Sequence, residues 1–440
     1  MNSATPCPIS QNLSQQLALA KPRRVLVAYS GGLDSSVLLH AVCQLKLTIP
    51  VCAIHVHHGL SSHADAWLEH CQARCDGYQR ELFAHKVDLP RPSRGQVAGL
   101  EQAARQARYE VFTQHLQAGD VLLMAHHQDD QVETFMMRLM RGSGLTGLSA
   151  MEVSRELGKG RLWRPLLGNS RAQIEHYAAQ HGVDHVEDES NGDTHFDRNW
   201  WRHALLPQIQ ARFPQSAQSV LKTIEVLQAE HALLNDLLEP VYQTLVDNQG
   251  CLINTKLSEQ SWSIQCQIVR KWQERHGCYP LLADKQIRSV ITDVLAARQD
   301  AEPIFKWQGN EIRRHNGKLY CMSSLPVIPR NVFPRAFNGT SLPPLPLGKL
   351  EQGIGLGLKP GQYQLALYAG NAKAKPINRP NKSLKKWFQE YAIPPWQRPY
   401  WPVLWQEERA GQERQVVAVP GLFVCQGFAC EQGWQLNFKP

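Results

Sequence analysis

The chain carries the sequence Val25-Leu-Val-Ala-Tyr29 directly before Ser30-Gly-Gly-Leu-Asp-Ser35, and a helical pattern continues to Leu45. A short apolar run of this kind is typical of a buried strand. Glycines let the backbone approach an anion closely, and the start of a helix offers unpaired N–H groups and the positive end of a dipole. These features together predict an anion-binding loop between strand and helix, formed by Ser30, Gly31, Gly32, Leu33, Asp34 and Ser35.

The alternation of strand and helix continues to about residue 205. Strand-like runs at 51–55, 82–87 and 121–125 alternate with helical patterns at 64–78 and 99–117. Such alternation implies an α/β fold with a doubly wound, Rossmann-like parallel sheet, whose ligands bind at the carboxyl ends of the strands. We therefore expect the loop to lie at the ligand-binding edge of this sheet.

Length and composition limit the class of protein. With 440 residues, 43% of them hydrophobic and 20% charged, the chain has enough material for two or three domains and is neither disordered nor fibrous. Its net charge of +8 is a modest excess that suits an anionic partner. The longest apolar runs are far shorter than the roughly twenty residues of a spanning helix, so we predict no membrane segment.

The cysteines and the N-terminal residues suggest a compartment. The 11 cysteines are scattered, and no two form a C-x-x-C pair, which fits reduced thiols better than disulfides or structural zinc. The basic Lys21, Arg23 and Arg24 follow the weakly apolar N-terminal stretch instead of preceding it, so a secretory signal is not predicted. We expect a cytoplasmic protein, and no obligatory protein partner is evident.

The pattern of secondary-structure signals in the sequence changes after Pro207. Residues 215–246 form a long helical pattern without strand signals, and prolines at 326, 329, 334, 343, 344 and 346 indicate a stiff linker. We therefore predict a catalytic domain at 1–214, a helical domain at 215–323, a proline-rich linker at 324–349 and a small, basic α+β domain at 350–440.

The loop differs from two common phosphate-binding motifs. It has neither the G-x-G-x-x-G of dinucleotide folds nor the G-K-[ST] of P-loops. Asp34 would repel phosphates unless a divalent cation lay between them, so magnesium is implied. The alternative is an ordinary glycine turn in which Asp34 or Ser35 merely caps the helix.

Further motifs give the loop a family context. S-G-G-x-D-S is similar to the pyrophosphate loop of the N-type ATP pyrophosphatases, which cleave ATP between the α and β phosphates and activate a substrate oxygen as an adenylate. Over most of residues 20–210, and more weakly near the C-terminus, the chain resembles the tRNA(Ile) lysidine synthetases. The motifs that carry this resemblance are His55-Val-His-His-Gly-Leu60, Glu101-Gln-Ala-Ala-Arg105 with Arg108-Tyr109, His126-His-Gln-Asp-Asp-Gln-Val-Glu-Thr134, Arg138, Arg141-Gly-Ser-Gly-Leu145, Trp163-Arg-Pro-Leu-Leu167, and Glu187-Asp-Glu-Ser-Asn191 with Arg198-Asn199 and Arg202.

The resemblance implies an adenine nucleotide alpha hydrolase-like fold and a two-step reaction. ATP would adenylate the C2 oxygen of the wobble cytidine in an isoleucine tRNA with a CAU anticodon, and L-lysine would then displace AMP to give lysidine. The implied cofactors are ATP and magnesium, and the implied partners are this tRNA and L-lysine. Alternatives are a tRNA thiolase or other amide-forming pyrophosphatase, and a catalytically silent RNA-binding relative.

Asp130 and Glu133 form the second chemical signal. They are three residues apart, so on a helix that starts after the fourth strand they share a face near the loop. Paired carboxylates there can hold magnesium, bind an amino group or accept its proton, although a solvated helix start is the alternative. The resemblance implies that Asp34 and Asp130 hold magnesium, that Glu133 orients or deprotonates lysine, and that Arg202 is a further catalytic residue.

Other residues of these motifs are candidates for anion binding. Guanidinium groups grip oxyanions with two hydrogen bonds, which suits ATP phosphates, the leaving pyrophosphate or the lysine carboxylate. The candidates are Arg105, Arg108, Arg198 and the segment Arg141-Gly142-Ser-Gly144, which is alternatively a flexible connection. The acidic run 187–189 could assist lysine or magnesium, or be a solvated turn. We do not predict a zinc site from the histidines at 55, 57, 58, 63 and 70 with Cys71 and Cys75.

Positive charge concentrates near the C-terminus. Residues 350–440 contain eleven Lys or Arg and six Glu, a net +5 of the whole chain's +8. Cations beside aromatic residues suit RNA, because they can bind phosphates and stack on bases. We predict tRNA binding by Lys373, Lys375, Lys382, Lys385 and Lys386, next to Trp387 and Phe388; a solvated face over a tryptophan core is the alternative.

Overall fold

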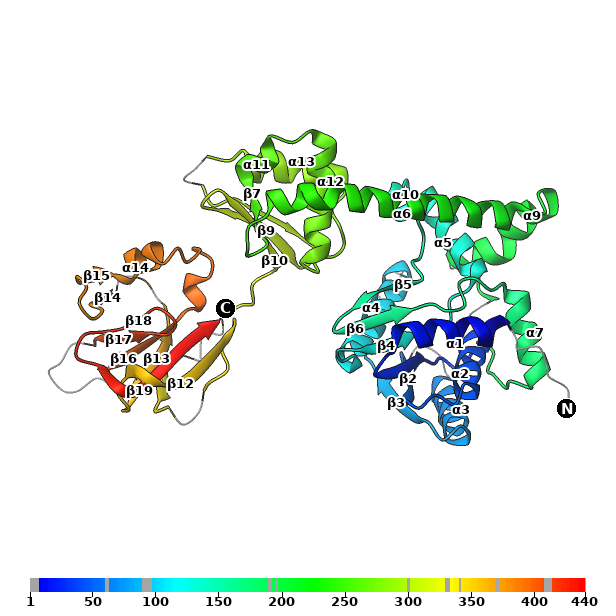
Figure 1. Ribbon diagram of the computed structural model, residues 1–440, viewed down its shortest axis with the longest axis horizontal. Helices are drawn as coiled ribbons and strands as arrows, with labels where there is room; N and C mark the ends of the chain where they lie inside the picture. Colours follow the sequence, from blue (N-terminus) through cyan, green and yellow to red (C-terminus); the bar gives the residue numbers. More distant parts are fainter. Residues whose placement is uncertain are drawn as a thin grey trace. The chain divides into compact units, whose positions relative to one another are not determined.

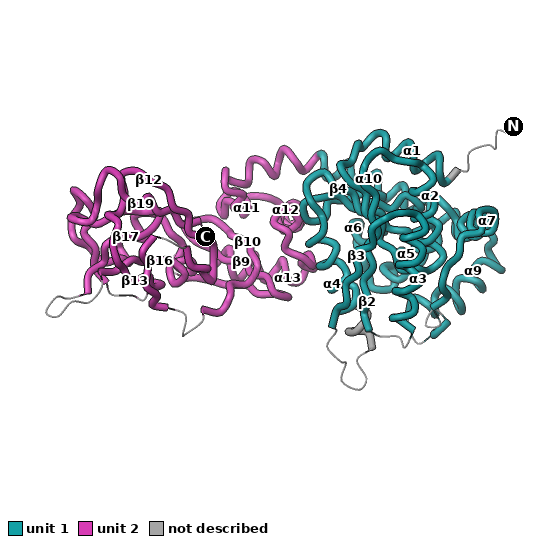
Figure 2. The backbone as a smooth tube through the Cα atoms, turned by 90° about the horizontal axis from the view of Figure 1, so that it is seen from below, with its two compact units in different colours: residues 1–236 teal, residues 237–440 magenta. Residues whose placement is uncertain are grey.

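The computed structural model describes residues 8–59, 63–88, 97–188, 192–194, 197–298, 301–328, 333–339, 342–368, 370, 372–406 and 414–439. The chain divides into two compact units, residues 1–236 and 237–440 (Figure 2). The boundary between them lies inside one long helix, α10 (Ser216–Leu245).

A six-stranded sheet forms the centre of the first unit, with the strand order β3-β2-β1-β4-β6-β5 (Figure 1). Neighbouring strands run parallel except in the edge hairpin β5–β6. The predicted doubly wound α/β fold is therefore confirmed. The strands are β1 (Arg24–Ala28), β2 (Val51–His57), β3 (Glu81–Lys86), β4 (Asp120–Leu123), β5 (Ser154–Leu157) and β6 (Gly160–Trp163).

The strand order places a ligand crevice between β1 and β4. The chain builds outward from β1 through β2 to β3 and then crosses to β4 on the other side of β1. In such sheets the crevice opens at the carboxyl ends of the two strands where the order reverses. The predicted anion loop follows β1, and the motif with Asp130 and Glu133 follows β4, so both lie at this edge.

Helices cover both faces of the sheet because successive strand residues point to opposite sides. Val25 and Val27 pack into a core shared with α1, α2, α3 and α7, whereas Leu26 faces a second core shared with α4. The bounds of these helices are α1 (Pro8–Ala20), α2 (Leu33–Gln44), α3 (Ala64–Gly77), α4 (Val97–His115) and α7 (Arg171–His181).

The first unit has further helical segments between β4 and α10. They are α5 (Gln128–Met140), α6 (Leu145–Leu148), α8 (Asp197–Trp200), a π-helical segment (Trp201–Leu205) and α9 (Leu206–Arg212). Ile224 of α10 packs with Phe135 of α5 and Ala150. Gln228 of α10 also donates to the carbonyl of Ser149 at 2.9 Å. The first half of α10 thus belongs to the first unit, beyond the predicted domain end at 214.

The second unit begins with a region of helices packed on a small sheet, whereas the sequence predicted only that the region is largely helical. Helices α11 (Asn254–Ser258), α12 (Trp262–Arg275) and α13 (Asp284–Ser289), with a π-helical segment (Val290–Leu295), pack on an antiparallel sheet in the order β7-β10-β9-β8. Its strands are β7 (Leu252–Ile253), β8 (Ile304–Trp307), β9 (Asn310–His315) and β10 (Lys318–Ser323). The prediction omitted this sheet because β8 to β10 are short and rich in charged residues, a pattern that resembles loops.

The C-terminal part contains a five-stranded sheet, β11-β13-β16-β17-β18, and a long two-stranded ribbon, β12–β19. β11 lies within the predicted linker, so that segment is not wholly irregular: it pairs with β13 and belongs to the sheet. The strands are β11 (Arg335–Phe337), β12 (Lys349–Leu358), β13 (Tyr363–Leu367), β14 (Lys373–Ala374), β15 (Lys382–Ser383), β16 (Pro402–Gln406), β17 (Val416–Val419), β18 (Phe423–Val424) and β19 (Ala429–Lys439), with one α-helix, α14 (Leu384–Glu390), and a 3-10 turn (Arg398–Tyr400).

Two chemical expectations can be compared with the described residues. The cysteines among them are all free thiols, and most are buried. None of the helices in these ranges is both long enough and apolar enough to cross a membrane.

Candidate active site

The loop after β1 has a backbone that only glycine accommodates well. Gly31 has φ +88°, and a Cβ at this position would lie 3.0 Å from the Cys71 sulfur and 3.1 Å from Val186. The carbonyl of Gly31 accepts hydrogen bonds from the Val186 N–H at 2.9 Å and from the Ser36 hydroxyl at 3.1 Å. The loop is therefore held by α3, which carries Cys71, and by the segment after α7, which contains Val186.

Serine hydroxyls connect the two ends of the loop. Ser35 Oγ donates to the carbonyl of Gly32 at 3.0 Å, and the Ser30 and Ser35 hydroxyl oxygens lie 3.0 Å apart. Gly32 is the N-cap of α2 and caps it with no side-chain hydrogen bond. A helix start without a side-chain cap leaves N–H groups for an anion, which is what the sequence predicted for this loop.

Asp34 lies in the first turn of α2 and contacts two basic side chains. Arg171 places one Nη 2.7 Å and 2.8 Å from the two Asp34 oxygens, and His127 Nε2 lies 3.9 Å from Oδ2. Burial raises the pKa of the Asp34 carboxyl above its usual value, although His127 and Arg171 oppose this effect. Once ionised, the Asp34 carboxylate can attract a cation at the phosphate loop.

Asp130 and Glu133 lie one turn apart on α5, as predicted, and both are buried. Arg198 of α8 places Nη2 2.6 Å from Asp130 and Nε 2.6 Å from Glu133. Arg202, in the π-helical segment, places Nε 2.6 Å from Glu133 and Nη2 3.3 Å from Asp130. We call these four residues the acid–arginine clamp; its two negative and two positive charges compensate one another.

The clamp and the phosphate loop meet at His127. Its Nε2 lies 3.6 Å from Asp130 Oδ2 and 3.9 Å from Asp34 Oδ2, so the two carboxylates that were predicted to hold magnesium converge on one nitrogen. Burial alone would raise the pKa of Asp130, but Arg198 and His127 lower it below its usual range. No group of three or more His, Cys, Asp or Glu in the described ranges forms a ready metal cage. Two carboxylates beside a phosphate loop nevertheless fit magnesium, which commonly binds through one or two carboxylates plus substrate phosphates and water.

Sequence reasoning missed Arg171, His127 and Arg164. Arg171 is the first residue of α7, directly after the N-cap Ser170, where a positive side chain opposes the helix dipole. Such a local conflict is a signal for function, because natural sequences break local rules mainly at functional sites. His127 is the N-cap of α5, inside a motif whose carboxylates alone were considered.

The other predicted arginines are separated in the structure. Arg105 and Arg108 lie on α4, with the Arg105 guanidinium 5.1 Å from the Tyr109 ring centre. Arg141 caps the far end of α5, three turns from Asp130, and lies 3.9 Å from exposed Asp197. The segment with Gly142 and Gly144 follows Arg141, so it is not brought to the phosphate loop.

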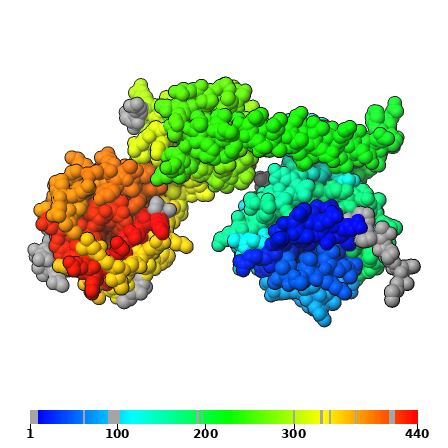
Figure 3. Space-filling view, viewed as in Figure 1, coloured from blue at the N-terminus to red at the C-terminus, as the bar shows by residue number. Residues whose placement is uncertain are grey.

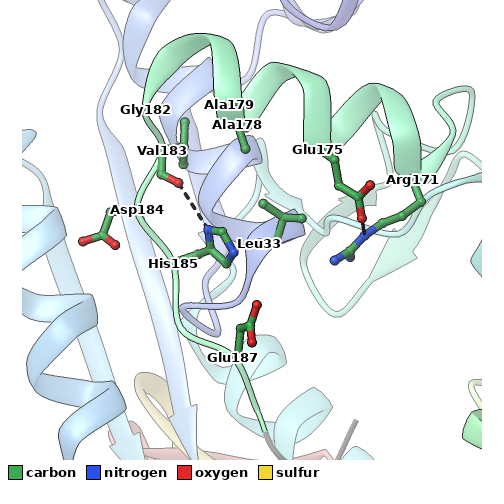
Figure 4. A pocket seen from close by; sticks show the side chains of 10 residues that line it. All are labelled: Leu33, Arg171, Glu175, Ala178, Ala179, Gly182, Val183, Asp184, His185 and Glu187. Atoms are coloured by element: carbon green, nitrogen blue, oxygen red, sulfur yellow. Dashed lines mark hydrogen bonds and ion pairs between the residues drawn. The ribbon is translucent and has the colours of Figure 1, made fainter. Parts of the chain in front are cut away.

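The acidic run after α7 lies beside the loop. Glu187 and Leu33 line one pocket with Arg171, Glu175 and His185 (Figure 4). Asp188 is described, whereas position 189 lies outside the described residues. The predicted candidates of this run therefore adjoin α2 and α7 at Glu187.

Two histidines of β2 and two cysteines of α3 have structural contacts. His55 Nδ1 lies 2.9 Å from the carbonyl of Tyr29 and 3.6 Å from the Cys71 sulfur, and His57 pairs with Asp65. Burial raises the pKa of Cys71 and of Cys75 to about 12 each, so both thiols are protonated at neutral pH. Cys71 serves as a packing surface beneath Gly31.

The C-terminal lysines lie on β14, β15 and α14, except Lys375, which follows β14. The segment that carries them (orange) reaches the surface (Figure 3). Lys373, Lys375, Lys385 and Lys386 are exposed, and no carboxylate of the described residues pairs with them. Lys382 differs, because Glu390 lies 2.8 Å from its Nζ. Trp387 and Phe388 are only 1% exposed, so the expectation that they stack on bases is wrong: they form the core behind the lysines.

Comparisons with known proteins show the family of the chain. Three family models match the chain: a PP-loop domain over residues 7–209, a TilS substrate binding domain over 255–320 and a TilS substrate C-terminal domain over 364–438. The chain is 35% identical to a tRNA(Ile)-lysidine synthase of Serratia proteamaculans, covering 98% of this chain and 99% of that protein. It is 38% identical to one of Vibrio vulnificus (94% and 95%) and 36% identical to one of Coxiella burnetii (94% and 93%). The predicted resemblance is confirmed: the chain belongs to the tRNA(Ile)-lysidine synthase family of tRNA-modifying ligases.

Proposed function

We propose that the protein joins L-lysine to C2 of the wobble cytidine of an isoleucine tRNA with a CAU anticodon, at the expense of ATP. The single observation that carries this proposal is the meeting of the phosphate loop and the acid–arginine clamp at His127. One side of this point suits a triphosphate, and the other offers buried carboxylates for an amine. A protein that only held RNA would need neither.

The first step forms the adenylate. The C2 oxygen of cytidine attacks the α-phosphorus of ATP, the bond to the β-phosphate breaks, and pyrophosphate leaves. Ser30 to Ser35 bind the phosphates through backbone N–H groups and hydroxyls, and Arg171 is placed to receive the leaving pyrophosphate. Magnesium, held by Asp34 and Asp130, would supply neutralisation of phosphate charge when bound.

The second step forms the carbon–nitrogen bond. The lysine ε-amine attacks C2, and AMP leaves with the former C2 oxygen. The amine must lose protons, and a carboxylate of the clamp can accept one. Glu133 is suited to orient or deprotonate it, because an ammonium carries the same charge as the guanidinium groups that Glu133 binds in this structure. Arg202 and Arg198, the basic members of the clamp, then bind the lysine carboxylate or hold the two carboxylates of the clamp in position.

Several further assignments belong to this proposal. Residues 1–214 would carry the catalysis, and 215–323 and 350–440 would bind tRNA through surfaces that include the C-terminal lysines. Arg105 and Arg108 would bind a substrate anion. The free cysteines of the described residues suit a reducing, cytoplasmic setting.

The test is incubation of the purified protein with labelled lysine, ATP and tRNA transcript. We expect label in the tRNA in a linkage that survives mild base, release of AMP and pyrophosphate, and lysidine in the nuclease digest. A transcript in which the wobble cytidine is replaced by uridine, and a methionine tRNA with the same anticodon, are the controls. The proposal fails if folded protein transfers no lysine to the correct transcript.

A further inference from the structure

Three arginines surround Tyr109 on the other side of β4 from the phosphate loop. The guanidinium carbons of Arg105 and Arg155 lie 5.1 Å and 5.4 Å from the Tyr109 ring centre, and Arg164 follows β6. The Tyr109 hydroxyl reaches Met124, the residue after β4, at 3.8 Å. We call Arg105, Arg155 and Arg164 the arginine cluster; α4 and β5, which carry two of them, are labelled in Figure 1.

The arginine cluster lacks negative partners. No carboxylate among the described side chains, which do not include Glu101, lies within 4 Å of Arg105, Arg155 or Arg164. Arg164 is only 4% exposed; one of its Nη atoms donates to the carbonyl of Glu152 at 2.6 Å, but its buried Nε has no partner there. A buried charged donor without a partner is costly, and such a group in a native protein needs an explanation.

Neighbouring groups respond to this excess of positive charge. Burial alone would raise the pKa of Tyr109, but Arg105, Arg164 and Arg155 lower it below its usual value. Burial, with repulsion from Arg155 and Arg105, lowers the pKa of Arg164 although Tyr109 opposes this. Burial and repulsion from Arg105 and Arg141 likewise lower the pKa of Arg138. A bound anion would compensate this excess of positive charge.

The position of the arginine cluster separates it from the ATP phosphates. β6 is the neighbour of β4, which is the neighbour of β1, and strands of a sheet are about 4.8 Å apart. Arg164 therefore emerges about 10 Å along the sheet edge from the phosphate loop. His126 links the arginine cluster to the acid–arginine clamp, because it interacts with Asp130 as well as with Arg164. The cluster thus adjoins the clamp on the side that ATP does not occupy.

We propose that Arg105, Arg155 and Arg164 form a subsite for the backbone phosphates of the substrate RNA, next to the base that is modified. This inference rests on the proposed function, which makes RNA a substrate. Three guanidinium groups exceed what one amino-acid carboxylate requires, whereas successive phosphodiesters supply several anions. Arginine is suited to phosphate because its planar fork donates two parallel hydrogen bonds.

The test compares four variants. Three of them carry Arg105→Gln, Arg155→Gln or both substitutions, and the fourth carries Arg161→Gln. Arg161 is a matched control, because it lies on β6 and is already paired with Glu156 at 3.1 Å. The probe is the anticodon-arm hairpin of the substrate tRNA, titrated at several KCl concentrations. We expect about tenfold weaker binding per cluster arginine and a salt slope reduced by about one for each. Arg161→Gln should bind like the wild type.

The second measurement of this test is equilibrium dialysis with labelled ATP. The cluster variants should bind ATP as tightly as the wild type. Weakened ATP binding with unchanged hairpin binding would overturn the inference in favour of a triphosphate site. Unchanged binding of both ATP and the hairpin would also overturn the inference, because the arginine cluster would then bind neither. Thermal unfolding confirms that each variant is folded.

The outcome for the proposed function is read separately, from lysine transfer by the wild-type protein. If the wild type transfers lysine but the variants bind the hairpin normally, only the subsite inference fails. If the wild type transfers no lysine but binds the hairpin through these arginines, the proposed function fails and the subsite stands. A wild type that transfers lysine to the full tRNA but does not bind the hairpin overturns the subsite inference alone.

Discussion

The acid–arginine clamp and the C-terminal lysines use charge in opposite ways. In the clamp, two buried carboxylates meet two guanidinium groups at distances down to 2.6 Å, and every charge has a partner. Lys373, Lys375, Lys385 and Lys386, which we call the lysine group, are exposed and unpaired with carboxylates among the described residues. The first arrangement fixes atoms in place, whereas the second only raises the local potential.

This difference separates chemistry from attraction. A compensated, buried set of charges loses its geometry when one member changes, since the remaining charges are left uncompensated in a low dielectric. Exposed lysines act additively through counterion release, so the loss of one is small and depends on salt. Substitutions in the two regions should therefore differ in size, in salt dependence and in the property that they change.

The largest effect is expected for Glu133→Gln. Glu133 is 1% exposed and accepts from both Arg198 and Arg202, so its neutralisation leaves two guanidinium groups facing each other. We expect a loss of stability of about 3 kcal/mol, at the lower end for a broken buried pair because both arginines are one-third exposed. Lysine transfer should fall by about 100-fold or more.

Thermal unfolding and lysine transfer, measured together, check this prediction. Glu110→Gln is the control, because Glu110 is an exposed glutamate on α4 whose carboxylate accepts a hydrogen bond from the neutral Gln106. If Glu133→Gln were as stable and active as Glu110→Gln, the clamp would not be a compensated set of charges.

Gly31→Ala should produce the next largest effect. The φ of +88° disfavours alanine, and the new Cβ would press on Cys71 and Val186. Gly427 offers a matched control in the C-terminal part, because its φ is +89° but nothing lies within 4 Å of the position that a Cβ would take there. We expect pyrophosphate release to fall at least tenfold only in Gly31→Ala. Equal losses of activity in the two variants would show that the close contacts beneath the loop do not matter.

Arg171→Gln should shift the pH dependence of pyrophosphate release. Arg171 counteracts the burial that raises the pKa of Asp34, so its removal raises that pKa further. Asp34 must be ionised to attract a cation, and it is protonated as pH falls. The acidic limb of the rate of pyrophosphate release should therefore shift to higher pH, while Arg171→Lys shifts it less. An unchanged acidic limb would exclude coupling between Arg171 and Asp34.

Local patterns in the sequence predicted the sheet, the anion loop and the carboxylate pair. Each depends on residues close together in the chain: an apolar run, two glycines before a helix, or a spacing of three on α5. Asp130 and Glu133 share a face because of helical periodicity alone, and no knowledge of distant residues is required.

The partners of these residues could not be predicted in the same way. Arg171 meets Asp34 across 137 positions of sequence, and Arg198 meets Glu133 across 65. The burial of Trp387 could be given only as an alternative for a related reason, because the strands that cover it lie elsewhere in the sequence. Basic and aromatic residues side by side suggested one surface, whereas the fold sends lysines outward and aromatics inward.

Replacing all four residues of the lysine group by glutamine tests whether these exposed charges, unlike those of the clamp, act only through electrostatic attraction. Each lysine that contacts a phosphate contributes about 0.7–0.9 to the slope of log affinity against log salt, so the slope should fall by up to about 3.6. Turnover at saturating tRNA should not change, because no atom of the clamp moves. Lys439→Gln is the control, since Glu351 lies 2.8 Å from its Nζ. A loss of turnover at saturating tRNA would contradict a purely electrostatic role.

Lys382→Gln should have the smallest effect on RNA binding. Its Nζ lies 2.8 Å from Glu390 and 4.8 Å from the Trp387 ring centre, so its charge already has partners. We expect a salt slope close to that of the wild type, whereas Lys385→Gln should lower it by about 0.7–0.9. The hydrogen bond from Lys382 lowers the pKa of Glu390, so the substitution should raise that pKa towards its usual value, as NMR titration can measure. If Lys382→Gln lowered the salt slope as much as Lys385→Gln, Lys382 would exchange Glu390 for phosphate, and a paired charge would also serve in RNA attraction.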